Sequence, residues 1–139
     1  MGISKAGESG TTRRNRLCKA IVLSISELLQ QKKPDNKCKD LVAFIILALH
    51  SIGETVEQAV VAWEKRDYWL KADKFRMEWS WTNMYAEQLH ELLNKGDWHN
   101  IVQSVIVIAK NLNKYTVSEK HRLGQPWTGA WAQLNIKKP

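Results

Sequence analysis

The sequence predicts an all-α protein, folded as an antiparallel up-down four-helix bundle with a tryptophan-containing C-terminal tail. Three observations support this fold class. Apolar residues recur at alternating steps of three and four in four successive segments, which is the period of an amphipathic helix. Pro34 and Gly96 interrupt that pattern, and each is followed by residues that can cap a helix. Short connections favour antiparallel neighbours, and 139 residues suffice for one domain with a real core.

The first two helices follow a small, polar segment at residues 1–11, which we expect to be disordered. Thr11 or Thr12 can cap the first helix, whose apolar positions are Leu17, Ile21, Ile25 and Leu28. Asp35 or Asn36 can cap the second helix, and Gly53 within it can permit a close contact with another helix. The second helix has the most regular pattern in the chain, with apolar side chains at Val42, Ile45, Leu49, Ile52, Val56, Ala59 and Trp63.

The third helix lacks a marked beginning, because the chain has neither glycine nor proline between Glu54 and Lys95. The second and third helices could therefore form one long rod. We favour a break near Tyr68–Asp73, since an extended stripe from the second helix would bring Arg66 and Asp73 into the core, and Asp73 could cap the helix that follows. The apolar positions of this third helix are Phe75, Trp79, Ala86, Leu89 and Leu93.

The fourth helix follows Gly96, which can take the left-handed conformation at a helix end, and Asp97, which can cap the next helix. Its apolar positions are Trp98, Ile101, Val105, Ile108, Leu112 and Tyr115, so the bundle spans residues 12–115. The tail at 116–139 places Trp127, Trp131 and Leu134 on one face of a short helix. We expect this face to pack on the bundle and close its basic pole; the alternative is an exposed anchor for a partner protein.

Composition limits the function classes. The formal net charge of +7 favours polyanionic partners. The N-terminal residues lack the apolar stretch of a signal peptide, and the run Leu41–Leu49 is too short to span a bilayer. Cys18 and Cys38 are separated by most of the first helix, so we expect two free thiols and a reducing compartment. These observations predict a cytoplasmic protein that does not bind a membrane.

The cations are expected to gather at one pole of the bundle. In an up-down topology, the beginnings of the first and third helices meet the ends of the second and fourth. Cations near the beginnings of helices are disfavoured by the helix dipole, so their presence there suggests that an anion is bound. The alternative is a pole that is merely solvated. The candidate nucleic-acid-binding cations are Arg13, Arg14, Arg16, Lys19, Lys65, Arg66, Lys71, Lys74, Arg76, Lys110, Lys114, Lys120 and Arg122.

The segment from Trp63 to Trp81 mixes five cations with aromatic rings. Cations can neutralise phosphates and exposed rings can stack on bases. Helical spacing assigns Trp63, Phe75 and Trp79 to the core, and leaves Trp69 as the best candidate for an exposed, base-contacting ring, with Trp81 as another candidate for exposure. The cations with no acid four residues away are expected to be the most available to phosphate: Lys65, Arg66 and Arg76.

No catalytic residue, metal site or cofactor is expected. The chain has no phosphate-binding glycine loop, zinc-ligand spacing or nucleophile motif. His50 with Glu54, and Glu87 with His90, each have the spacing of half a metal site in a helical bundle. The two histidines would be offset along the bundle by roughly 10 Å, which makes a shared metal improbable.

In size, helical pattern and basic clusters such as Arg13-Arg14-Asn15-Arg16 and Lys65-Arg66, the chain resembles the small helical subunits of CRISPR effector complexes. The resemblance covers residues 12–115. It implies a bundle without an active site that lines the path of nucleic acid inside an antiviral defence assembly. No pattern of that group accounts for Trp127 and Trp131.

The leading hypothesis is therefore a non-catalytic protein that binds the backbone of RNA or single-stranded DNA within a larger assembly, largely independently of sequence. The second hypothesis is a scaffold that docks on another subunit or on its own copy through Trp127, Trp131 and Leu134. The third is a metal-dependent helical enzyme that uses His50, Glu54, Glu87 and His90.

Overall fold

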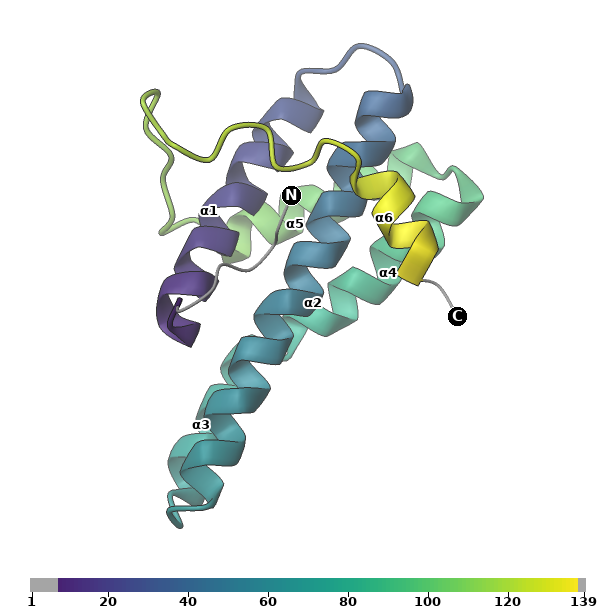
Figure 1. Cartoon of the computed structure of the whole chain (residues 1–139). Coiled ribbons are helices and arrows are strands. Elements are labelled where there is room, and N and C mark those ends of the chain that lie inside the picture. The colour runs from purple at the N-terminus through teal and green to yellow at the C-terminus, as the bar shows by residue number, and fades with distance from the viewer. Residues whose placement is uncertain (1–7, 138–139) are drawn as a thin grey trace.

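The computed structural model describes residues 8–137, and their fold is all-α (Figure 1). Most of the segment predicted to be disordered, residues 1–7, lies outside the described residues. The described part contains six helices where four were predicted. They are α1 (Gly10–Leu29), α2 (Asn36–Glu64), α3 (Trp69–Trp79), α4 (Trp81–Lys95), α5 (Trp98–Asn111) and α6 (Ala130–Lys137).

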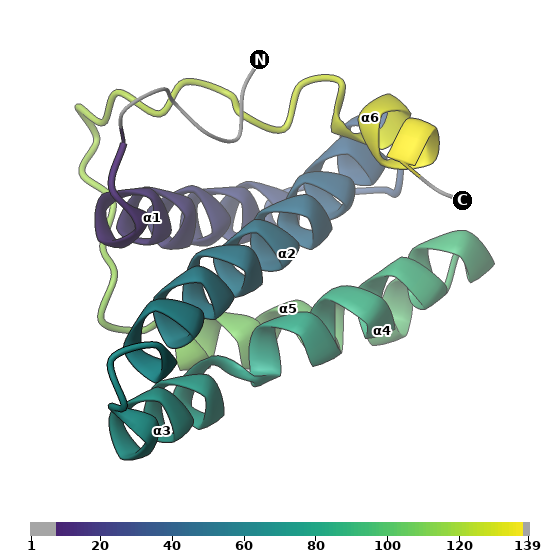
Figure 2. The same ribbon diagram turned by 60° about the horizontal axis from the view of Figure 1, so that its bottom comes forward.

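Helix α2 is the centre of the fold. Helices α1, α3, α4 and α6 all pack on it, while α5 packs on α4 and α1 (Figures 1 and 2). Every residue from Leu41 to Leu49 is buried, because α1, α4 and α6 together surround this part of α2. By length and composition alone α2 could also cross a membrane, but the fold buries 61% of its most apolar window, as in the core helix of a soluble protein.

The helix ends follow local capping chemistry. Asp35 caps α2 by accepting from the Cys38 N–H, and Asp97 caps α5 by accepting from Asn100, as the sequence predicted. These hydrogen bonds hold the pKa of each carboxyl below its ordinary value. Gly96 ends α4 in the left-handed conformation. The prediction of Thr11 or Thr12 as the cap of α1 was wrong by two or three residues: Ser9 is the cap, and its hydroxyl accepts from the Thr12 N–H.

The predicted third helix is two helices. The break from α2 falls at residues 65–68, at the near edge of the predicted interval, and a second break at Ser80 separates α3 from α4. Tyr68, and not Asp73, precedes α3, without a side-chain cap. Helix α4 crosses α2 at Gly53, where an added Cβ would lie 2.7 Å from the Asn83 Oδ1, so the expected close approach at this glycine is present.

Asp67 makes the turn between α2 and α3 with a φ of 62°, the only positive φ at a described residue other than glycine. Residues other than glycine incur a steric cost in this conformation because they carry a Cβ. Replacing Asp67 with glycine is therefore expected to raise the free energy of unfolding by about 0.5 kcal/mol in chemical denaturation. As a control, Asp73→Gly in exposed α3 should lower it by about 1 kcal/mol. A loss of stability in the Asp67 variant would show that the turn does not carry this strain.

Candidate nucleic-acid interface

The predicted basic segments converge on the first turns of α1. Arg14 donates from Nη1 to the Thr55 Oγ1 on α2 at 3.1 Å, and its guanidinium carbon lies 4.9 Å from the centroid of the Phe75 ring on α3. Tyr115, just beyond α5, donates to Asn15 Oδ1 at 3.5 Å. The beginning of α1 therefore lies beside the second half of α2, the middle of α3 and the segment just after α5.

The α2–α3 corner, residues 63–75, lies at one end of the molecule (Figure 1), and most of its residues are exposed. Its four cations are solvent-exposed, and none forms an ion pair with a described residue. Two of them lie over rings, with Arg66 5.4 Å from the Tyr68 centroid and Lys71 4.5 Å from the Trp63 centroid. These corner cations are Lys65, Arg66, Lys71 and Lys74.

A groove of about 850 Å³ runs along the corner between the end of α2 and α3. Trp69 lines it with 55% of its surface exposed, beside Leu70 at 72%. Trp63 and Phe75 form its inner wall, where their rings meet edge to face at 5.0 Å. The expected division of the rings is present: Trp79 is buried, Trp63 and Phe75 are half-buried against the core, and Trp69 is exposed. Trp81 is half-buried and stacks on Trp79, so it is not the exposed ring that was considered possible.

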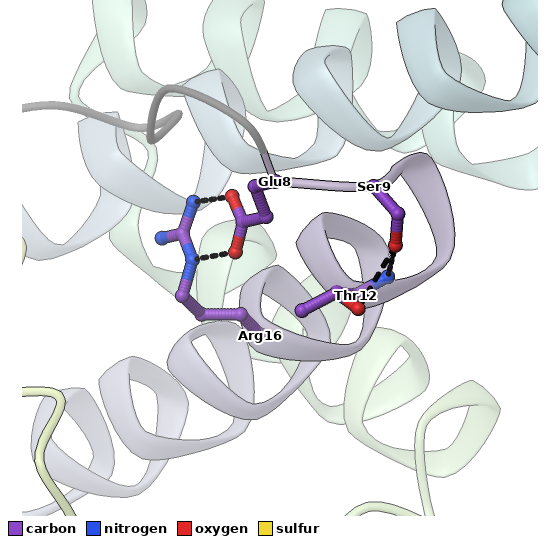
Figure 3. Close-up of polar contacts among 4 residues, drawn as sticks. All are labelled: Glu8, Ser9, Thr12 and Arg16. Carbon is purple, nitrogen blue, oxygen red and sulfur yellow. Dashed lines mark hydrogen bonds and ion pairs between the residues drawn. The ribbon is translucent and has the colours of Figure 1, made fainter.

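Three of the predicted phosphate-binding cations are engaged within the protein. Arg14 is 9% exposed and faces the interior. Arg16 forms two hydrogen bonds to the Glu8 carboxylate, each of 2.9 Å, which also make an ion pair (Figure 3). Arg76 was expected to be among the most available, and this was wrong: its guanidinium lies 3.2 Å from Glu57, 3.6 Å from Glu64 and 3.7 Å from Asp73.

The remaining predicted cations lie on α1, on the last turn of α5 and in the segment that follows α5. Lys19 is exposed on α1 and Arg13 is half-buried there. Lys110 is exposed on the last turn of α5, and Lys114 lies 5.3 Å from the Tyr115 centroid. Lys120 and Arg122 are exposed in the segment between α5 and α6, which Figure 1 shows passing outside α1, away from the α2–α3 corner.

The tail residues are internal. Trp127 and Leu134 are buried and Trp131 is half-buried against α2, so they cannot be an exposed anchor for a partner. Their position also corrects the prediction. Asp40, near the beginning of α2, accepts from the Trp131 N–H at 2.9 Å and from the Gly129 N–H at 3.3 Å. The tail therefore packs at the end of α2 opposite the α2–α3 corner and does not close the basic pole (Figure 1).

An exposed apolar row on α3 and α4 was missed. Leu70, Met77 and Met84 are 72%, 76% and 57% exposed. Their spacing of seven residues was visible in the sequence, but they lie off the stripe that was assigned to the core. A second set of apolar residues at helical spacing within the predicted third helix is the signal that would have found them.

The structure also bears on the predictions for the two cysteines and for a metal site. Cys18 and Cys38 are free and buried. Burial raises the pKa of Cys18 to about 11 and that of Tyr115 to about 12, and their side chains interact. Among residues 8–137, no three histidine, cysteine, aspartate or glutamate side chains are grouped so that they could hold a metal ion.

Comparison of the chain with protein-family models, with curated proteins and with solved structures finds no match. The class that the fold and the corner define is an all-α protein with an exposed cluster of cations and aromatic rings at one end.

Proposed function

We propose that the protein is a non-catalytic nucleic-acid-binding subunit that contacts the phosphate backbone through its α2–α3 corner. The observation that carries this proposal is the set of four exposed corner cations, without ion-pair partners among the described residues, beside the exposed ring of Trp69. Cations without ion-pair partners displace counterions from the nucleic acid when they contact its phosphates. An exposed ring can stack on a base. Contacts to phosphates carry no direct sequence information, so recognition through these cations is largely independent of sequence.

The proposal assumes an up-down bundle in which α3 and α4 together take the place of one helix. Contacts of α1 and α4 with both α2 and α5 support that arrangement. The frame matters because it brings the segment that holds Lys114 beside the first turns of α1, where Tyr115 contacts Asn15. A strand that follows this end could contact cations from α1, α3 and the segment after α5.

We further propose that the protein works within an assembly. The support is the exposure of three large apolar side chains, Leu70 and Met77 on α3 and Met84 on α4, since exposed apolar side chains that gather on a surface are a feature of interaction sites. This row lies on α3 and α4, next to the corner, so a neighbouring subunit on it would border the bound strand. A scaffold that binds only proteins would use the same row, and it would bind its partner equally well after the corner cations are removed.

The test reverses Lys65 and Lys74, the two corner cations that do not lie over a ring of a described residue. Lys65→Glu with Lys74→Glu is expected to weaken binding of labelled RNA and single-stranded DNA at least about tenfold in fluorescence anisotropy. The matched control is Lys32→Glu with Lys33→Glu, two exposed lysines in the α1–α2 connection at the other end of the molecule (Figure 1). The control makes the same change in net charge and is expected to bind almost as well as the wild type.

Salt provides the second readout. Wild-type affinity should fall steeply between about 50 and about 200 mM salt, and the slope should be shallower for the corner variant. If both double variants bound nucleic acid equally weakly, only net charge would matter. That result would contradict a site at the corner. Binding to anionic vesicles with none to nucleic acid would instead identify a membrane surface as the partner.

A further inference from the structure

Arg14 is a buried cation that has no anionic partner among residues 8–137. It is 9% exposed, and its Nη1 donates to Thr55 at 3.1 Å. The guanidinium lies over the rings of Phe75 and Trp79, at 4.9 and 5.7 Å from their centroids. In the described part of the chain, no carboxylate forms an ion pair with it. A guanidinium has five N–H donors, so most of its hydrogen-bonding capacity is unused.

The Trp79 ring beside Arg14 carries a further donor that lacks an acceptor. Its Nε1 is buried and has no hydrogen-bond partner among the described residues. Burying a charged group without a counter-charge costs several kcal/mol, and stacking on rings offsets only part of this cost. The buried donors of this region therefore lack a negatively charged acceptor in the described part of the chain.

A pocket of about 420 Å³ opens beside Arg14, between the first turn of α1 and the second half of α2. Thr11, Thr55 and Gln58 supply further polar groups, Trp63 and Phe75 supply an apolar wall, and none of the lining residues is acidic. The beginning of α1 also faces the pocket through Gly10 and Thr11. The Ser9 hydroxyl accepts from the Thr12 N–H, so the first N–H groups of the helix are left for another acceptor (Figure 3).

We propose that this pocket binds a phosphate monoester, either a free mononucleotide or the phosphorylated end of a nucleic-acid strand. A monoester carries nearly two negative charges at neutral pH and can take two parallel hydrogen bonds from one guanidinium. An internal phosphodiester carries one charge and must leave room for the chain on both sides. The pocket volume lies within the range of small-molecule sites, and its aromatic wall suits a sugar or base.

The strand-end form of the inference rests on the proposed function, whereas the mononucleotide form does not. The corner cations would hold internal phosphates, and the Arg14 pocket would hold the terminal phosphate. Arg14 then serves the same partner as the corner, although it lies inside the protein and not on its surface.

The experiment fills the pocket with a carboxylate. Gln58 is exposed and lines the pocket, so Gln58→Glu should fold normally while placing a negative charge beside Arg14. The control Gln103→Glu makes the same change in charge at an exposed position of α5. The probes are AMP, followed by calorimetry, and one labelled oligonucleotide with either a 5′-phosphate or a 5′-hydroxyl, followed by anisotropy.

Wild type and Gln103→Glu are expected to bind AMP, or to prefer the 5′-phosphorylated strand by at least about tenfold, as charge-assisted hydrogen bonds would give. Gln58→Glu is expected to lose the effect that the wild type shows, whether that is AMP binding or preference for the 5′-phosphorylated strand. Binding of AMP would identify the mononucleotide as the ligand, and preference without AMP binding would identify the strand end.

Absence of both effects in the wild type would overturn the inference, as would their survival in Gln58→Glu. Such a failure is distinguishable from failure of the proposed function. If only this inference fails, the wild type still binds strands in a salt-dependent way and the Lys65 and Lys74 double variant does not. If the proposed function fails, the wild type shows no such binding.

Discussion

Replacing Trp127 with alanine is expected to lower the free energy of unfolding by about 3–5 kcal/mol, the usual cost of removing a large aromatic side chain from a core. Trp127 is 6% exposed and belongs to the same buried cluster as the centre of α2. Its loss would uncover the α2 surface next to Leu134 and weaken the contact that lets Asp40 cap α6. Chemical denaturation followed by circular dichroism measures the effect.

The matched control for this prediction is Trp69→Ala. The two changes remove the same atoms, but Trp69 is 55% exposed at the α2–α3 corner. Its replacement should alter the free energy of unfolding by no more than about 0.5 kcal/mol. If the two variants were equally stable, the tail would not be part of the core, and the interaction role predicted for Trp127 would be open again.

The second large effect is expected at alkaline pH. Burial raises the pKa of the Cys18 thiol from an ordinary 9.0 to about 11. The folded protein therefore holds this proton more tightly than the unfolded chain does. The corresponding stabilisation is complete below pH 9 and is lost as the pH rises through 11, a change of roughly 2–3 kcal/mol. Tyr115, whose pKa is raised by burial to about 12, changes stability in the same direction at higher pH.

Comparison of the wild type with Cys18→Ala isolates the thiol. Urea titrations across pH 8 to 11 should show the wild type losing stability relative to the variant as the pH approaches and passes the raised pKa. Parallel profiles would mean that the thiol ionises as readily in the folded protein as in the unfolded chain. The same burial should keep Cys18 unreactive towards alkylating reagents until the protein unfolds.

The helices could be predicted because their signals are local. Apolar spacing located the bodies of α1, α2 and α5, and capping residues located the beginnings of α2 and α5. The break at Ser80 has no such signal. The chain stays helical on both sides of it, and α4 takes its direction from packing against α2 at Gly53. Contacts between helices decide such a bend, and residue spacing within one helix does not report them.

The site was predicted less well for the same reason. The availability of Arg76 was inferred from acids four residues away, but Glu57 and Glu64 reach it from another helix. Arg14 was placed on the surface because it belongs to a basic cluster, whereas the fold puts it between Thr55 and the α3 rings. The part of the prediction that stands is the exposed mixture of cations and rings at the corner, where Lys65, Arg66 and Trp69 are exposed.

The capping of α6 by Asp40 has a consequence for synthesis of the protein. The two partners of this cap are 91 residues apart in the chain. At about 5–20 residues per second, the ribosome needs roughly 5–20 s to make the intervening segment. During that time the nascent chain carries α2 with its α6-facing surface uncovered. The protein is therefore expected to be a client of ribosome-associated chaperones, which would shield this apolar surface until α6 arrives.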